Sequence, residues 1–213
     1  MNSLVTFALF AALLTITPGL DTLLVLRVAG SGGRGAGIAA TAGIHIGCLV
    51  WGAASAVGVT ALLTASRVAF DALRLAGAAY LCWLGVRALW TVMRRPREDD
   101  RTGAPALSDQ QHWSRGRALR TGLTTNLLNP KVGAFYLSVV PQFLPSGVNP
   151  LAGSMALTAI HALEGMLWLS AVALVVNRAR AVLTRPSVRR WFEQITGVVL
   201  VGFGIRLALD NTA

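Results

Sequence analysis

The chain has 213 residues, of which 54% are hydrophobic and only 13% are charged, and its formal net charge is +10. Ordinary soluble domains carry about 25% charged residues, so the composition excludes that class, and the high apolar content excludes a disordered chain. Residues 35–66 contain no Asp, Glu, Lys or Arg. That run exceeds the roughly 20 apolar residues that cross a bilayer as a helix, and it predicts an all-α integral membrane protein.

Six apolar segments are long enough to span a membrane. Apolar runs of this length exclude a porin-type barrel, whose strands are about ten residues of alternating polarity. An even number of spans places both ends of the chain on the same side. The six are expected at Leu4–Val28, Ile38–Leu63, Leu73–Val92, Ala118–Leu144, Leu151–Val176 and Trp191–Leu209.

Most of the arginines lie in the connections between these segments. The connections after the third and fifth segments are rich in arginine, whereas the one after the fourth has no charged residue. Because cytoplasmic loops carry the excess of Lys and Arg, the connections after the first, third and fifth segments are expected in the cytoplasm and both termini outside. Topology thus accounts for the positive charge, and no nucleic-acid partner is expected.

Three sequence features recur in the same order in the two halves of the chain. A proline beside a charged residue comes first, then a histidine followed by a tryptophan, then an arginine in an apolar run. The pairs are TPGLD (17–21) with LNPKV (128–132), GIHIGCLVW (43–51) with AIHALEGMLW (159–168), and LGVRAL (84–89) with FGIRLAL (203–209).

The recurrence predicts a first three-helix repeat at 1–93, a cytoplasmic polar loop at 94–117 and a second three-helix repeat at 118–213. Each half has an odd number of helices, so the second half must enter the membrane from the opposite face. Inverted repeats whose first helices are broken by proline are typical of secondary transporters, in which the site lies near the midplane between the halves.

Pro18 and Pro130 fall near the middle of the first and fourth segments. A proline within a helix removes a backbone hydrogen bond and leaves unpaired carbonyls before the break and free amides after it. In lipid these groups are costly unless protein, water or a ligand satisfies them. Asp21 and Lys131 add one charge of each sign, which suits a zwitterionic amino acid. The alternative is that both prolines only kink their helices and that the two charges pair with each other.

The predicted substrate site follows from these breaks. Lys131 and the starts of the two half-helices are expected to hold a carboxylate, because helix N-termini attract anions. Asp21 is expected to face an amine or to exchange protons, because ionisable groups within a membrane usually mark function. The full set is Pro18, Gly19, Asp21, Asn129, Pro130 and Lys131, with Asn126 as a further residue that could cap or line the break.

Glu164, His45 and His161 are candidates, with Asp21, for coupling transport to an ion. Histidine titrates near neutral pH, although a lone histidine in a membrane helix is as often a packing residue. A second hypothesis is efflux of a metal cation by Asp21, Glu164, His45, Cys48 and His161. No catalytic residue, resident metal or cofactor is predicted, and no nucleophile and base stand at a spacing that indicates an enzyme.

Long stretches of the chain resemble a known family. TITPGLDTLLVLRVAGSGGRGAGIAATAGIHIG, GAAYLCWLGVRAL, GLTTNLLNPKVGAFYLSVVPQF and FGIRLAL are similar, in this order, to the LysE/RhtB family of bacterial amino-acid exporters. The chain departs from the family pattern at Leu20, where a second proline is frequent, and at Asp21, where Asn is common. The resemblance implies a cytoplasmic-membrane exporter of amino acids or related metabolites, driven by proton exchange and assembled as a homodimer.

Overall fold

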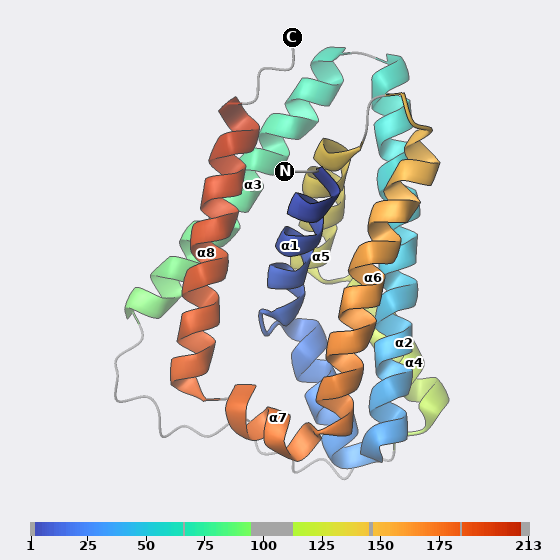
Figure 1. Ribbon diagram of the computed structural model, residues 1–213, viewed down its shortest axis with the longest axis vertical. Helices are drawn as coiled ribbons and strands as arrows, with labels where there is room; N and C mark the ends of the chain where they lie inside the picture. Colours follow the sequence, from blue (N-terminus) through green and yellow to red (C-terminus); the bar gives the residue numbers. More distant parts are fainter. Residues whose placement is uncertain (1–2, 66, 95–112, 145–146, 184, 210–213) are drawn as a thin grey trace.

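The computed structural model describes residues 3–65, 67–94, 113–144, 147–183 and 185–209, and no β-strand occurs in these ranges (Figure 1). Most elements are apolar helices that run along the long axis of the molecule. In chain order they are α1 (Ser3–Ile16), α2 (Leu20–Ala65), α3 (Arg67–Arg94), α4 (Arg115–Leu127), α5 (Pro130–Ala134), a π-helical turn η2 (Phe135–Val139), a 3-10 turn η3 (Val140–Phe143), α6 (Pro150–Leu174), α7 (Val176–Leu183) and α8 (Pro186–Leu209).

Four helical stretches in the described residues are long and apolar enough to cross a bilayer. They are Leu20–Gly58, Arg74–Met93, Pro150–Leu174 and Pro186–Leu209. Large apolar side chains such as Val57, Leu163 and Leu167 are more than 60% exposed, and a surface of this kind is stable against lipid rather than water. The prediction of an all-α, multi-pass membrane protein is therefore confirmed.

The first of these stretches reverses direction within α2. Gly33 has φ 80° and ψ 170° inside an otherwise helical run, a backbone conformation that favours glycine because it has no Cβ. The chain turns here at one end of the molecule and runs back along its length (Figure 1). α2 thus consists of two arms, residues 20–32 and 34–65.

Glycines bring the two halves of the chain into backbone contact. The long arm of α2 packs on α4 and α6, and α3 packs on α8. A Cβ at Gly43 of α2 would overlap the carbonyl of Leu119, and a Cβ at Gly122 of α4 would overlap the carbonyl of Ala40. Small residues allow such close approach between membrane helices, so the α2–α4 interface depends on both glycines.

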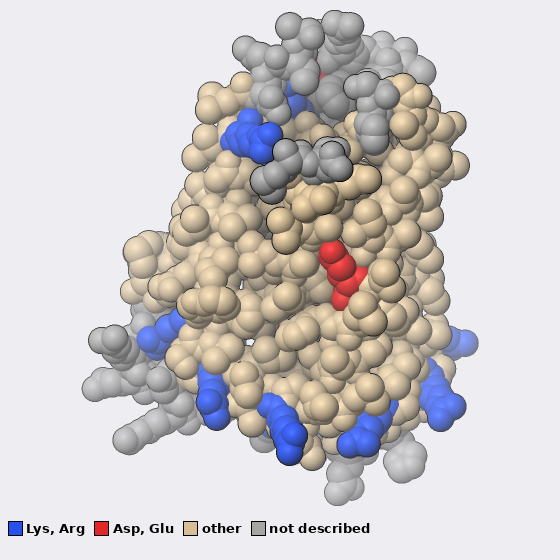
Figure 2. Space-filling view, viewed as in Figure 1, with Lys and Arg blue, Asp and Glu red and all other residues tan. Residues whose placement is uncertain are grey.

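Basic side chains gather at one end of the face that Figure 2 shows. Figure 2 shows Lys and Arg mostly along the lower edge of this face, at the end where α7 lies across the long helices in Figure 1. α7 contains Arg178 and Arg180. The predicted loop at 94–117 lies outside the described residues over 95–112, while its edges are helical, since α3 includes Arg94 and α4 begins at Arg115.

Candidate functional site

The first predicted break lies between α1 and α2. α1 ends at Ile16 and α2 begins at Leu20, so Pro18 sits in the non-helical link. In a continuous helix the Leu14 carbonyl would accept a hydrogen bond from residue 18, but proline has no N–H. Lys131 Nζ donates to Leu14 O at 2.8 Å and to Thr17 O at 3.3 Å. A lysine from the second half of the chain therefore replaces the hydrogen bond that Pro18 removes.

The second predicted break lies between α4 and α5 and is completed locally. Pro130 occupies the first position of α5, where its missing N–H costs nothing. Asn129 Oδ1 accepts a hydrogen bond from Lys131 N at 3.1 Å, which caps the new helix. Before the break, Leu128 N donates to Thr124 O at 3.0 Å. Neighbours in sequence thus satisfy the backbone here.

Asp21, beside the first break, is also linked to the second half of the chain. It lies in the first turn of α2, where a negative charge is favourable, and its Oδ2 accepts a hydrogen bond from Asn126 Nδ2 at 3.0 Å. Its Oδ1 is buried and has no hydrogen-bond partner among the described residues. No salt bridge joins Asp21 to Lys131 in this conformation: Asp21 accepts from Asn126, and Lys131 donates to the two carbonyls of the first break.

One cavity collects most of the predicted site residues. Its lining includes Gly19, Asp21, His45, Asn129, Lys131 and His161, and also Cys48. Pro18, Pro130 and Glu164 do not line it. The space open to the centre of a water molecule is about 50 Å³, enough for a few waters because one water needs about 10–15 Å³ on this measure. In this conformation the cavity is too small to hold a whole leucine.

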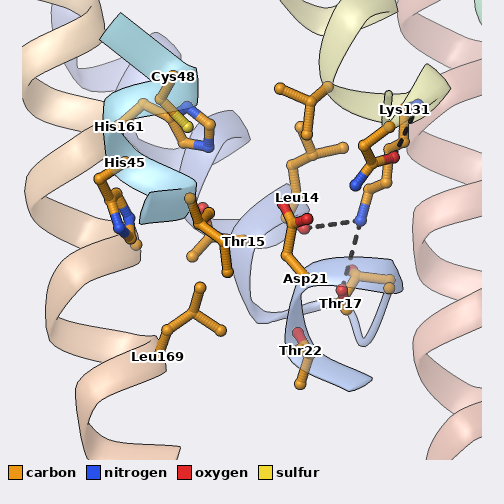
Figure 3. Close-up of a pocket in the computed structure, with 15 residues that line it drawn as sticks. Leu14, Thr15, Thr17, Asp21, Thr22, His45, Cys48, Lys131, His161 and Leu169 are labelled. Atoms are coloured by element: carbon orange, nitrogen blue, oxygen red, sulfur yellow. Dashed lines mark hydrogen bonds between the residues drawn. The ribbon is translucent and has the colours of Figure 1, made fainter. Parts of the chain in front are cut away.

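The two sides of the cavity differ in chemistry. Figure 3 shows Lys131 with its two carbonyl partners on one side, and His45, His161 and Cys48 on the opposite side. Thr15 Oγ1 is a second buried oxygen of the lining without a partner among the described residues. Buried polar atoms are rarely left unsatisfied, so water or a polar ligand in the cavity would complete the hydrogen bonding of Thr15 and Asp21.

The two aligned histidines have different partners. His45 Nδ1 is 2.7 Å from Thr41 O, and because a carbonyl only accepts, Nδ1 carries the proton in this bond. His161 Nδ1 lies 2.9 Å from Tyr136 Oη. Tyr136 belongs to the π-helical turn η2, an irregularity that frequently marks functional sites.

Glu164 and the metal hypothesis fit the structure less well. Glu164 directly precedes Gly165, which lines the cavity, but its own side chain is half-buried elsewhere, and Oε2 lacks a partner among the described residues. Its coupling role stays a prediction.

Within the described part of the chain, no three His, Cys, Asp or Glu side chains are close enough together to hold a metal ion. Efflux of a metal cation is therefore not favoured.

Several residues of the site were not assigned a role from sequence. Thr15, Thr17 and Thr22 line the cavity, and Thr17 Oγ1 also meets Thr196 Oγ1 of α8 at 2.5 Å. The sequence signal that could have identified them is the cluster of three threonines around Pro18 in TITPGLDT. No sequence signal identified Tyr136, because a π-helical turn depends on packing that the sequence does not display.

Comparison with known proteins agrees with the broken helices and the charged cavity. Residues 12–211 match the LysE type translocator family. The chain belongs to this family. No solved structure matches it.

Among LysE-type relatives, the chain is 28% identical over 210 residues to the uncharacterized membrane protein YrhP of Bacillus subtilis, covering 99% of this chain and 100% of that protein. It is 30% identical to the leucine efflux protein of Enterobacter sp. (strain 638), covering 95% of this chain and 93% of that protein. It is 26% identical to the threonine efflux protein of Escherichia coli K12, covering 97% of each chain. The resemblance drawn from the sequence motifs is thereby confirmed.

Proposed function

We propose that this LysE-type translocator is a secondary transporter that exports amino acids across the bacterial cytoplasmic membrane through the cavity between the two helix breaks. The observation that carries the proposal is a carboxylate and an ammonium group that line one cavity without pairing with each other. Relatives named leucine and threonine efflux proteins support the same substrate class.

The unused hydrogen-bond donors and acceptors of the site suit a zwitterion. Asp21 Oδ1 has no hydrogen-bond partner among the described residues, so it can accept a hydrogen bond from a substrate ammonium, with Thr15 Oγ1 as a second acceptor. Lys131 uses two of its three N–H donors on Leu14 O and Thr17 O, which leaves one for a carboxylate. Asn129 uses its Oδ1 to cap α5 and also lines the cavity.

The transport cycle is proposed to use two inverted three-helix repeats, with six spans and both termini outside. The contacts across the halves support this: α2 packs on α4, α3 packs on α8, and Asn126 and Lys131 of the second half both donate hydrogen bonds to the first half. The arginine-rich end that carries α7 then faces the cytoplasm. Because the cavity is too small for a whole leucine as it stands, it must enlarge during the cycle to admit such a substrate.

Proton exchange is proposed as the driving force, with Asp21 as the principal proton acceptor. His45 and His161 line the same cavity, and Glu164 lies on the same helix as His161, one turn away. Assembly as a homodimer is also proposed, because the family resemblance implies it.

The test is efflux of labelled amino acids from preloaded cells, with and without a protonophore. Wild-type protein is expected to give selective efflux that the protonophore abolishes. Asp21→Asn keeps an acceptor for Asn126 but loses the charge, so it is expected to reach the membrane in normal amounts and to lose at least about tenfold in rate. Glu164→Gln is expected to have the smaller effect. Wild-type efflux rates in folded Asp21→Asn would contradict the site assignment.

A further inference from the structure

The contact between His45 of α2 and Gly165 of α6 forms part of the cavity wall. Both residues line the cavity. A Cβ added at Gly165 would overlap His45 Nε2 and would lie 3.4 Å from both neighbouring ring carbons. The imidazole edge therefore rests directly on the backbone of α6, in space that only a glycine leaves open.

The position of the His45 ring is held from two sides. Its Nδ1 donates to Thr41 O at 2.7 Å, one turn back in α2, while its Nε2 edge meets Gly165. The side chain is 5% exposed, so there is little free volume around it. Extra volume at position 165 would force the ring either to give up the bond to Thr41 or to move into the cavity.

His45 also stands where a substrate side chain would point. In the proposed binding mode, Asp21 and Lys131 hold the ammonium and the carboxylate. His45 lies on the side of the cavity opposite to Lys131, and Leu169 lies on the same side (Figure 3). Ile44 and Leu169 supply apolar surface to the lining, which suits an aliphatic side chain.

We infer that His45, seated against Gly165, sets the largest amino-acid side chain that the cavity admits. This inference rests on the proposed function and deepens it: the transported class is amino acids with small or medium aliphatic side chains, and bulkier aromatic ones are rejected at His45. A change of one methyl group in such a wall alters discrimination between substrates by about tenfold or more.

The test compares size profiles in proteoliposomes that contain purified full-length protein. Transport of labelled alanine, threonine, leucine and phenylalanine is measured, each in a separate experiment. Gly165→Ala is expected to keep transporting alanine, while its preference for leucine over alanine falls about tenfold. His45→Asn keeps a donor for Thr41 O with less volume, and is expected to admit phenylalanine. The double variant Gly165→Ala, His45→Asn is expected to recover leucine.

Gly202→Ala is the matched control, because a Cβ at Gly202 of α8 meets nothing within 4 Å. It is expected to keep the wild-type profile. If Gly165→Ala slows all four amino acids equally and His45→Asn does not restore them, the inference is overturned while the proposed function stands. Wild-type protein that transports none of the four would overturn the proposed function, and this inference with it.

Discussion

The two helix breaks look alike in sequence and are satisfied in different ways. At the second break, Asn129 caps α5 and Leu128 bonds back into α4, so the chain repairs the damage within a few residues. At the first break, the carbonyl freed by Pro18 is satisfied by Lys131, which is 117 residues further along the chain. One break is self-contained, whereas the other depends on the opposite half.

This difference gives Lys131 two roles. Its ammonium group stabilises the end of α1, and it also lines the cavity in which a substrate carboxylate is proposed to bind. In that binding mode the third N–H of Lys131 would meet the carboxylate, so the substrate would contact the same group that links the two halves at the first break.

The largest effect is expected for Lys131→Met. The Leu14 and Thr17 carbonyls would be left without this donor inside the membrane, which costs on the order of 2 kcal/mol or more. The melting temperature in detergent should fall and transport should be lost. Pro18→Ala in the same protein restores an N–H to Leu14 O, and it is expected to recover the melting temperature without recovering transport.

Pro130→Ala is the matched control for this rescue. Pro130 begins α5 and its change returns no donor to Leu14 O. The pair Lys131→Met, Pro130→Ala should therefore remain as unstable as Lys131→Met alone. Equal rescue by either proline replacement would show that the two breaks are equivalent, and it would refute the contrast drawn between them.

A smaller effect is expected at the second break. Asn129→Ala removes the cap of α5 and should lower the free energy of unfolding by about 1 kcal/mol, whereas Asn129→Ser keeps a capping oxygen and should lose only a fraction of that. Denaturation by detergent titration measures both. Equal losses in the two variants would mean that Asn129 acts through the cavity rather than as a cap.

Much of the site could be predicted because proline and intramembrane charge are rare and local signals. Pro18 and Pro130 located both breaks, and Asp21 and Lys131 were expected at one site and do line one cavity. The helical class followed from the apolar runs. These features depend on residue type and spacing, which the sequence displays directly.

The hydrogen-bond partners of the site residues could not be predicted in the same way. That Lys131 binds the Leu14 carbonyl, and that Asn126 rather than Lys131 binds Asp21, depends on how the two halves dock. The seating of His45 on Gly165 has the same origin, since it needs α2 and α6 in contact. Glu164 was predicted only as a candidate for ion coupling, because it is a charge deep in an apolar segment, and its side chain does not line the cavity.

The most direct test of the central claim, that substrate occupies the cavity between the two breaks, uses the two native cysteines. Cys48 lines the cavity, whereas Cys82 lies against α8 and does not. The measurement is the rate at which a small thiol reagent modifies each cysteine in the full-length protein, with and without a transported amino acid. The account predicts that Cys48 reacts as the cavity opens and that saturating amino acid slows its reaction severalfold while leaving Cys82 unchanged. A Cys48 rate that does not respond to any transported amino acid would contradict it.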